Sequence, residues 1–353
     1  MADISHITQP TVAAIDAAWE AEGNRQKGHR PHLGGSIIGN ECNRALWYGF
    51  RWCTDKSFDG RLLRLFNRGH EEENRFIRDL RKAGATVHDC DDRTGEQFLF
   101  KAVGGHVGGS MDGVGKGLPE SPDKWHVLEF KTHSDKSFKA LAKDGVEKSK
   151  PLHFAQMQLY MHWSGIDRAF YLAVNKNTDE LYSERVRYQQ REAERLEDKA
   201  RRIVEASTPP PRMSEDPSFY LCKFCDHYDL CHQAAAPAVN CRTCAHSTPV
   251  MTGNGQWNCA FNDSVIETNR QRKGCEHHLF IPELMWHAGA EAVDASAQEN
   301  WIEYRLPNGR TFRNGPKAPS SYPSIELINL PTEIAAEEGF EKLRLSFDGW
   351  AVS

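Results

Sequence analysis

Apolar positions along the chain follow two different spacings. A spacing of three and four residues predicts amphipathic helices over 11–22 and 67–83, and Gly34-Gly35-Ser36 supplies a loop and an N-cap for a helix that continues to about Phe50. Gly84 follows the helix over 67–83 at the position where glycine commonly ends one. Beyond it, alternation of apolar and polar residues predicts strands over 85–91, 97–103, 107–114 and 126–131.

Helical and strand-like segments then alternate up to a proline breaker. Helices are predicted over 137–144 and 152–164, strands over 169–175 and 181–188, and a charged helix over 190–206. Pro209-Pro210-Pro211 ends this part of the chain. The order of elements predicts an α/β fold with a central mixed β-sheet flanked by helices. A cysteine-rich C-terminal extension follows, and its tail has strand-like runs over 301–306 and 343–347.

The composition is that of a soluble globular protein. Of the 353 residues 39% are hydrophobic, the mean hydropathy is −0.64, and no apolar run approaches the length of a membrane span. The N-terminal residues lack the basic and then apolar pattern of a secretion signal. We therefore expect no membrane contact and a cytoplasmic, reducing location, where ten cysteines are more typical of metal ligands than of disulfides.

Charge is distributed unevenly although the net charge is only −5. Nine Lys and Arg residues stand against three acids over 25–68, a local balance of +6, and eleven acids stand against six bases over 281–353, a local balance of −5. The basic segment is typical of a groove that follows a phosphate backbone, with the acidic segment facing elsewhere. A solvated surface without a ligand is the alternative.

Two acids and one lysine form the most informative constellation in the sequence. Glu129 and Lys131 are two residues apart on a predicted strand, so their side chains share one face while the apolar neighbours point to the other. Asp112, in Met111-Asp112-Gly113, precedes this strand across a loop and predicts a hairpin. Metal-assisted phosphodiester hydrolysis requires such groups, carboxylates to hold Mg²⁺ or Mn²⁺ and a lysine to orient water. An ordinary Asp-Gly turn and a solvated Glu-x-Lys pair remain the alternative.

Three further side chains lie on helix faces that could approach these carboxylates. Glu73 shares the apolar stripe of the helix over 67–83, where a carboxylate is costly unless it is paired or bound to a metal. The alternative is that the helix dipole and solvent satisfy it. Gln156 and Tyr160 are four residues apart and share a face, so an amide and a phenol could bind a phosphate or a water. A surface hydrogen bond is the alternative for this pair.

Taken in order, four motifs resemble those of the PD-(D/E)xK nuclease superfamily: Gly69-(x3)-Glu73, Met111-Asp112-Gly113, Glu129-Phe130-Lys131 and Gln156-(x3)-Tyr160. They are most similar to the RecB-type branch, which includes phage exonucleases and CRISPR-adaptation nucleases. The resemblance covers about residues 34–232. It implies a restriction-endonuclease-like core, Asp112 and Glu129 as ligands of Mg²⁺ or Mn²⁺, and Lys131 as the catalytic lysine.

The resemblance also implies roles for the helical residues. Glu73 would contribute to the metal site, and Gln156 and Tyr160 would form the accessory motif of the following helix. Two positions depart from the usual pattern. Many RecB-type members have histidine where this chain has Glu73, whereas lambda-type exonucleases have glutamate, and Met111 stands where the superfamily's name has proline.

A first cysteine cluster lies just after the proline breaker. Cys222-x2-Cys225-x5-Cys231 offers three thiolates, one short of a closed site, and Cys42 is the natural fourth ligand. RecB-type nucleases with an iron–sulfur cluster resemble this arrangement. The resemblance implies a [4Fe–4S] cluster that joins the two ends of the nuclease core and stabilises it by closing a long loop.

A second cluster is typical of a zinc-ribbon-like module: Cys241-x2-Cys244-x14-Cys259-x15-Cys275, with His246, His277 and His278 nearby. A rival allocation makes one zinc site of Cys222, Cys225, Cys241 and Cys244. We favour two separate sites because they use eight of the ten cysteines. The remaining two, Cys53 and Cys90, are then expected to be buried apolar residues.

These expectations divide the chain into an N-terminal helix and linker (1–33), a nuclease core (34–235), a zinc-binding cysteine module (236–280) and a small acidic region of unassigned role (281–353). The leading hypothesis is a Mg²⁺- or Mn²⁺-dependent DNA exonuclease that acts on linear DNA in phage-type recombination or DNA processing. The alternatives are an endonuclease of the same fold and a non-catalytic, metal-stapled module that binds DNA or protein. The C-terminal region is expected to contact a partner such as a recombinase or a single-strand-binding protein.

Overall fold

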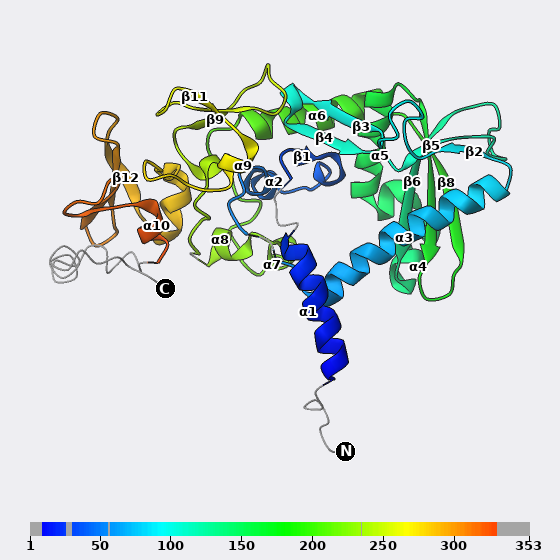
Figure 1. Ribbon diagram of the computed structural model, residues 1–353, viewed down its shortest axis with the longest axis horizontal. Helices are drawn as coiled ribbons and strands as arrows, with labels where there is room; N and C mark the ends of the chain where they lie inside the picture. The colour runs from blue at the N-terminus through cyan, green and yellow to red at the C-terminus, as the bar shows by residue number, and fades with distance from the viewer. Residues whose placement is uncertain (1–8, 26–29, 56, 234, 330–353) are drawn as a thin grey trace.

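The structure is a computed structural model that describes residues 9–25, 30–55, 57–233 and 235–329. The strand predicted over 343–347 lies outside these residues. Figure 1 shows an elongated molecule with the sheet that contains β5 (Gly113–Lys116) and β6 (His126–His133) at one end and a C-terminal sheet at the other. Helix α1 (Pro10–Arg25) extends from the body and contacts α3 (Gly60–Lys82), which agrees with the helix predicted over 11–22.

The central element is a five-stranded mixed sheet in the order β2-β5-β6-β7-β8. Its strands are β2 (Thr86–His88), β5 (Gly113–Lys116), β6 (His126–His133), β7 (Arg168–Asn175) and β8 (Leu181–Arg187). Strands β6 and β7 are parallel, and the other neighbours are antiparallel. The predicted α/β fold with a central mixed sheet flanked by helices is therefore confirmed.

Helices cover both faces of this sheet. Helix α3 packs on one face, where Phe76 stacks on Phe130 at 5.2 Å between ring centroids and Leu128 is also buried. Helices α4 (Asp135–Ser149) and α5 (Pro151–Ser164) pack on the other face, and α6 (Gln190–Glu205) packs against α5. Alternate residues of β6 thus enter two different cores, as a period of two requires.

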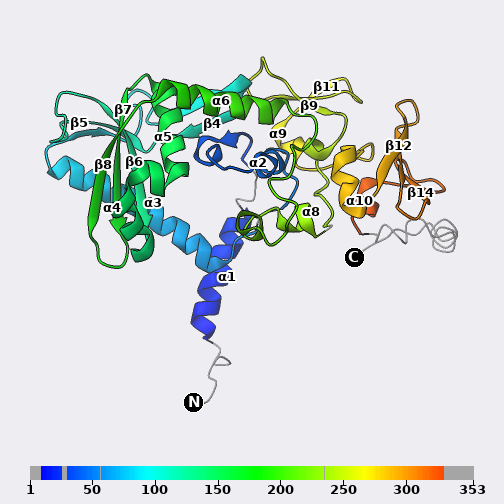
Figure 2. The same ribbon diagram turned by 180° about the vertical axis from the view of Figure 1, so that it is seen from behind.

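Three smaller sheets continue the molecule away from the central sheet (Figure 2). One contains β1 (Leu33–Gly34), β4 (Val107–Ser110) and β3 (Leu99–Ala102). A second contains β9 (Ser247–Pro249), β10 (Trp257–Cys259) and β11 (Ser264–Ile266). The third has its own apolar core and contains β12 (Glu291–Ser296), β13 (Trp301–Arg305), β14 (Thr311–Asn314) and β15 (Ser321–Tyr322), followed by α10 (Ser324–Leu327).

Short helices connect these parts. The cysteine-rich segments carry α7 (Tyr220–Lys223), α8 (Tyr228–His232), α9 (Thr268–Gln271) and a 3₁₀ helix at Cys241–Thr243. Further 3₁₀ turns lie at Gly35–Ile37, Val103–Gly105 and Pro282–Ala288. None of the helices in the described ranges has the length and apolarity needed to cross a bilayer.

Three predicted elements were wrong in their limits. The helix predicted from Ser36 is in fact a 3₁₀ turn followed by the separate helix α2 (Asn43–Phe50). Helix α2 begins after Cys42 because the Cys42 sulfur caps it, accepting a hydrogen bond from the Ala45 N–H at 3.4 Å. Helix α3 begins at Gly60 rather than at 67, since Asp59 caps it. The strand predicted over 107–114 is two strands, β4 and β5, in different sheets.

Three of the basic residues over 25–68 that the structure describes are buried or paired and do not form an open phosphate-binding surface. Arg44 and Arg51 are buried, and Arg64 forms an ion pair with Asp16 of α1. The predicted groove along this segment is therefore wrong for these three positions. Arg51 lies instead over the rings of Trp47 and Trp257, with its guanidinium carbon 5.4 and 5.0 Å from the two ring centroids.

Two buried arginines join the N-terminal segment to the cysteine module. Arg242 is fully buried and donates hydrogen bonds to Phe50 O at 2.9 Å and Pro31 O at 2.8 Å. Its guanidinium carbon lies 3.7 Å from the ring centroid of Trp52, within cation–π range. Arg51 donates to the carbonyl of Arg242 itself at 3.2 Å. Among the described residues neither guanidinium forms an ion pair, so carbonyls and aromatic faces stabilise both charges.

We expect Arg242→Ala to lower the free energy of unfolding by about 3 kcal/mol, since it opens a cavity and leaves buried carbonyls without donors. Urea unfolding followed by tryptophan fluorescence measures the change. Arg93→Ala, which removes an exposed arginine paired with Asp91, is the matched control and should have little effect. Equal stabilities of the two variants would contradict a structural role for Arg242.

Candidate active site

Strand β6 places Glu129 and Lys131 on one face of the central sheet, as predicted. Glu129 is completely buried, and its carboxylate forms an ion pair with the Lys131 ammonium. Lys131 also donates a hydrogen bond to Phe130 O at 2.9 Å. Apart from the ion pair, the structure describes no hydrogen bond to either carboxylate oxygen of Glu129. A buried carboxylate with free lone pairs is suited to accept a cation.

Asp112 lies beside this pair, in the two-residue connection between β4 and β5. Its Oδ2 accepts a hydrogen bond from the Phe130 N–H at 2.8 Å, which fixes the carboxylate next to β6. The register Gly113↔Leu128 brings the connection alongside Glu129. Gly113 is required here because its φ is +153° and a Cβ would lie 2.7 Å from His88 O. The chain therefore changes from one sheet to another at the acid.

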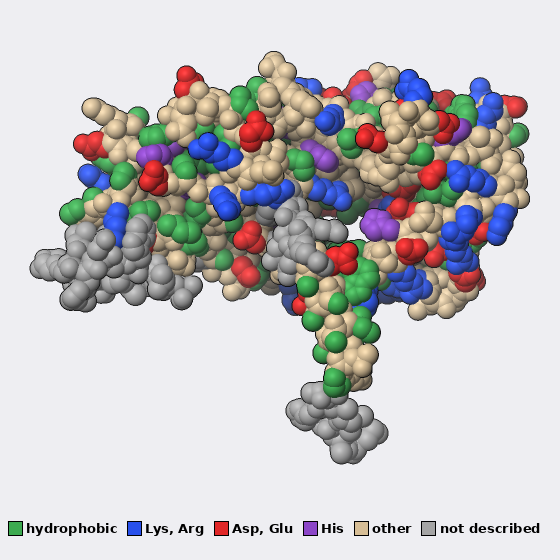
Figure 3. All heavy atoms as spheres, viewed as in Figure 1, with side chains coloured by type: hydrophobic (Ala, Val, Ile, Leu, Met, Phe, Trp, Pro, Cys, Tyr) green, Lys and Arg blue, Asp and Glu red, His purple; other side chains and the backbone are tan. Residues whose placement is uncertain are grey.

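Glu73 reaches the same place from α3. Its side chain is 32% exposed and lies 3.7 Å from His70 Nδ1. Burial and the Asp112 charge raise the pKa of Glu73, which indicates that the two carboxylates are close. In the surface view the molecule is hollowed beside α3, and acidic and histidine side chains are visible there (Figure 3).

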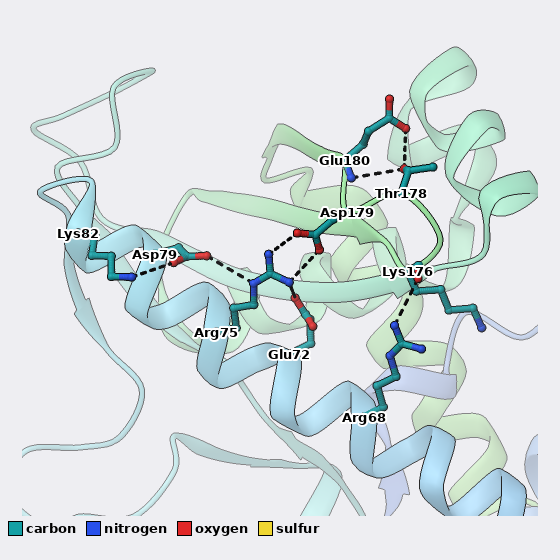
Figure 4. A network of polar contacts seen from close by, with 9 residues as sticks. All are labelled: Arg68, Glu72, Arg75, Asp79, Lys82, Lys176, Thr178, Asp179 and Glu180. Carbon is teal, nitrogen blue, oxygen red and sulfur yellow. Dashed lines mark hydrogen bonds and ion pairs between the residues drawn. The ribbon is translucent and has the colours of Figure 1, made fainter.

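The neighbouring Glu72 has a structural role instead. Its side chain is 16% exposed, less than that of Glu73, and pairs with Arg75 at 3.2 Å. Arg75 also makes a bidentate ion pair with Asp179 at 2.8 and 2.6 Å (Figure 4). Arg68 donates to Lys176 O at 3.3 Å. These contacts tie α3 to the β7–β8 turn and so fix the helix that carries Glu73.

Electrostatics around Glu129 favour an added cation. Burial, together with the charges of Asp112 and Glu73, raises the pKa of Glu129 to about 8, although the Lys131 ammonium opposes this shift. Burial alone would lower the pKa of Lys131, but Glu129, Asp112 and Glu73 together raise it. The lysine therefore stays charged, and three acids share one ammonium.

Gln156 and Tyr160 of α5 complete this side of the site. Both are buried, and Tyr160 is hydrogen-bonded to Gln156. Burial raises the pKa of Tyr160, and the Glu129 and Asp112 charges add to the effect, so the phenol lies near both acids. A Cβ at Gly109 of β4 would lie 2.5 Å from the Tyr160 hydroxyl oxygen, so the backbone there approaches the phenol closely.

The geometry brings the predicted groups together without closing them around an ion. In the ranges that the structure describes, no group of three or more His, Cys, Asp or Glu side chains is close enough to hold a metal ion. Asp112, Glu129 and Glu73 are thus electrostatic neighbours and not a formed coordination shell. Their oxygen donors and surplus negative charge nevertheless fit a hard divalent cation.

Three residues of this site were missed in the sequence. His133 continues the alternation of Glu129 and Lys131 on β6, and His153 precedes Gln156 by one helical turn on α5. Both histidines contact Tyr171 of β7, at 2.8 Å from His133 and 2.9 Å from His153. Their spacing to the recognised motifs could have identified the histidines, but Tyr171 carries no signal in the sequence.

The first cysteine set lines a single cavity. Cys42, Cys222, Cys225 and Cys231 border it together with Arg44, Tyr48 and His227. Burial raises the pKa of Cys222, and Cys231 and Cys42 raise it further, so the thiols are close. Cys225 Sγ accepts a hydrogen bond from the His227 N–H at 3.5 Å. Four thiols at one cavity are donors of the kind that bind zinc or an iron–sulfur cluster, although among the described residues no three of them are close enough to hold a single ion.

The second set lines another cavity: Cys241, Cys244, Cys259 and Cys275. Burial, with smaller contributions from Cys275 and Cys259, raises the pKa of Cys241 to about 11. Two of the three nearby histidines are hydrogen-bonded to other side chains: His246 to Asn300 at 2.7 Å and His278 to Ser324 at 2.8 Å.

The two cavities separate the cysteines as the favoured allocation does. Cys222 and Cys225 line one cavity, whereas Cys241 and Cys244 line the other, which disfavours a single zinc site made from these four. Cys53 is fully buried, as predicted. The prediction for Cys90 was wrong, because it is only partly buried and lines an open cavity near Trp125.

No family model and no curated protein sequence matches the chain. Three solved structures resemble it in part. Two are of the alkaline exonuclease LHK-Exo from Laribacter hongkongensis, one of them in complex with dAMP, each at 14% identity and a TM-score of 0.36 over 53% of this chain and 90% of the other. The third is SSO0001, at 14% identity and a TM-score of 0.37 over 62% and 94%. Likenesses this low assign no activity, so the case for one depends on the site.

We expect Glu129→Gln to raise the melting temperature of the metal-free protein at pH 8 and to change it little near pH 5. The folded-state pKa of Glu129 is about 8, above its ordinary value of 4.5, so the stability contributed by the protonated carboxyl is lost as the pH rises through this interval. Calorimetry at the two pH values measures the difference.

Added Mn²⁺ should raise the melting temperature of the wild type and leave Glu129→Gln unchanged, because a ligand stabilises only the form that binds it. Asp123→Asn, at an exposed acid, is the control and should respond as the wild type does. An equal Mn²⁺ response in Glu129→Gln would mean that Glu129 holds no metal.

Proposed function

We propose that the protein is a metal-dependent deoxyribonuclease that hydrolyses phosphodiester bonds of linear DNA, as an exonuclease. The observation that carries the proposal is the convergence of Asp112, Glu129 and Lys131 on the edge between two sheets, with Glu73 reaching the same place from α3. Glu129 is completely buried, whereas an ordinary Glu-x-Lys pair on a solvated strand would be exposed. The alternative of an ordinary solvated pair is therefore disfavoured.

Each residue has a definite task in this proposal. Asp112 and Glu129, with Glu73, would hold Mg²⁺ or Mn²⁺, which supplies charge to polarise the phosphate and lower the pKa of a bound water. Lys131 stays protonated beside Glu129 and orients the attacking water or offsets the charge that develops on the phosphate. Tyr160, held by Gln156, offers a phenol proton to a phosphate oxygen.

We also propose that Cys42, Cys222, Cys225 and Cys231 hold a [4Fe–4S] cluster, and that Cys241, Cys244, Cys259 and Cys275 hold Zn²⁺. The shared cavity of each set and the mutual effect of its thiols support the two groupings. Cys42 is the N-cap of α2 and the other three of its set follow α6, so a cluster would join the N-terminal segment to the end of the core.

Lys131→Ala is expected to abolish Mg²⁺- or Mn²⁺-dependent degradation of linear DNA while the protein stays folded, because it removes the only ammonium described at the carboxylates. Release of acid-soluble nucleotides measures the rate. Lys139→Ala, at an exposed lysine paired with Asp135, is the matched control and should retain full activity.

The form of the substrate separates the two modes of cleavage. An exonuclease leaves covalently closed circles intact while it degrades linear DNA, whereas nicking or linearisation of the circles would identify an endonuclease of the same fold. An unaltered rate in Lys131→Ala would rule out the proposed site altogether.

Protein purified without oxygen is expected to be brown and to contain iron, and Cys225→Ser should lose both the colour and the iron because a cluster ligand is removed. Cys90→Ser, outside both sets, should retain them. Metal analysis of the same samples counts iron and zinc. A colourless wild type that contains zinc alone would overturn the cluster assignment.

A further inference from the structure

A hydrogen-bonded chain beside Lys131 has no role in hydrolysis as described so far. It begins at His153, whose Nδ1 lies 2.9 Å from the Tyr171 hydroxyl oxygen. The same hydroxyl lies 2.8 Å from His133 Nε2, and His133 Nδ1 lies 3.1 Å from Ser137 Oγ. Three consecutive polar contacts therefore link α5, β7, β6 and α4.

These hydrogen-bonded residues lie on and beside the strand that carries Glu129 and Lys131. Lys131 and His133 share a face of β6, and Tyr171 is the register partner of Glu129 on the parallel strand β7. The His153 and Tyr171 rings are nearly parallel, with an interplanar angle of 25° and 5.8 Å between centroids. Helix α5 thus holds His153 over the same face of the sheet that carries the catalytic pair.

The donor and acceptor roles of these hydrogen-bonded side chains depend on one another. A tyrosine hydroxyl donates one hydrogen bond, so one histidine accepts from Tyr171 while the other donates to it. If His153 donates from Nδ1, then Tyr171 donates to His133 Nε2, and His133 donates from Nδ1 to Ser137. In that arrangement Nε2 of His153 carries a lone pair, and the structure describes no hydrogen bond to it.

Neither histidine is suited to hold a positive charge. Burial lowers the pKa of His133 to about 4, and Lys150 and Lys131 contribute. Burial likewise lowers the pKa of His153 to about 3, and Lys131 is the largest charge acting on it. A single histidine here would be a poor base. A linked pair avoids the problem, because one ring can release a proton while the other takes one up.

We propose that His153, Tyr171 and His133 form a proton relay that removes the proton released when water attacks the scissile phosphodiester. This inference rests on the function proposed above. The water oxygen bonds to phosphorus as the bond to the leaving oxygen breaks, and the water proton passes to Nε2 of His153. The leaving oxygen takes a proton from solvent.

The proton transfers along the relay are concerted with this step, so no histidine carries a positive charge at any point. The Nδ1 proton of His153 passes to the Tyr171 oxygen, and the Tyr171 proton passes to Nε2 of His133. The Nδ1 proton of His133 passes to the hydroxyl of Ser137, which is partly exposed and releases its own proton to solvent. All three rings are neutral before and after the transfer.

Tyr171→Phe tests the relay because it removes one oxygen and keeps the ring. It should lower kcat for linear DNA on the order of a hundredfold, the usual size of a proton-transfer contribution. DNA affinity, measured by anisotropy with Ca²⁺ in place of the catalytic ion, should stay as in the wild type. The solvent deuterium effect on kcat should show several protons in flight in the wild type and only one in Tyr171→Phe.

Two further variants keep the test decisive. Tyr182→Phe removes a hydroxyl bonded to Glu184 at 2.6 Å on the same sheet, outside the relay, and should retain wild-type turnover. His153→Gln, at a partly exposed position on α5, should reproduce the loss seen in Tyr171→Phe even if that variant folds poorly.

The outcomes distinguish the relay from the activity itself. Suppose that the wild type degrades DNA and Lys131→Ala does not. If Tyr171→Phe and His153→Gln then have the same kcat as Tyr182→Phe, the relay is refuted and the nuclease assignment stands. If the wild type degrades no DNA with Mg²⁺ or Mn²⁺, both proposals fail. A loss of DNA affinity in place of kcat would assign the three residues to binding and also overturn the relay.

Discussion

A buried charge imbalance on strand β6 determines what this site can bind. Glu129 has no exposed surface and its one described polar partner is Lys131, while Asp112 and Glu73 add negative charge nearby. Three acids around one ammonium leave a surplus that the protein interior stabilises poorly. A divalent cation would neutralise it. The central sheet supplies the rigidity this requires, because β6 is paired on both sides and covered by helices on both faces.

Sequence patterning predicted the parts of this site that depend on local periodicity. Alternation along β6 correctly placed Glu129 and Lys131 on one face and Phe130 on the other. Helical spacing placed Gln156 and Tyr160 together on α5. In each case a single element decides which side chains share a face, so two residues of one element are enough to predict it.

Features that depend on tertiary contacts could not be predicted in this way. The segment over 107–114 alternates like one strand, yet the chain changes sheets at Asp112 because Gly113 packs against the backbone of β2. Tyr171 lies in a uniformly buried strand, so nothing local marks it as the link between His133 and His153. The spacing of the cysteines divides them into the same two sets that line the two cavities. It gave no indication that a fully buried arginine, Arg242, would join their module to the core.

The most direct test of the account is a crystal structure of the full chain with Mn²⁺, in which anomalous scattering locates the ion. The account predicts one manganese peak within bonding distance of carboxylate oxygens of both Asp112 and Glu129. Lys131 should still lie beside Glu129. A manganese ion bound only elsewhere, with the Glu129–Lys131 pair closed and no density between Asp112 and Glu129, would contradict it.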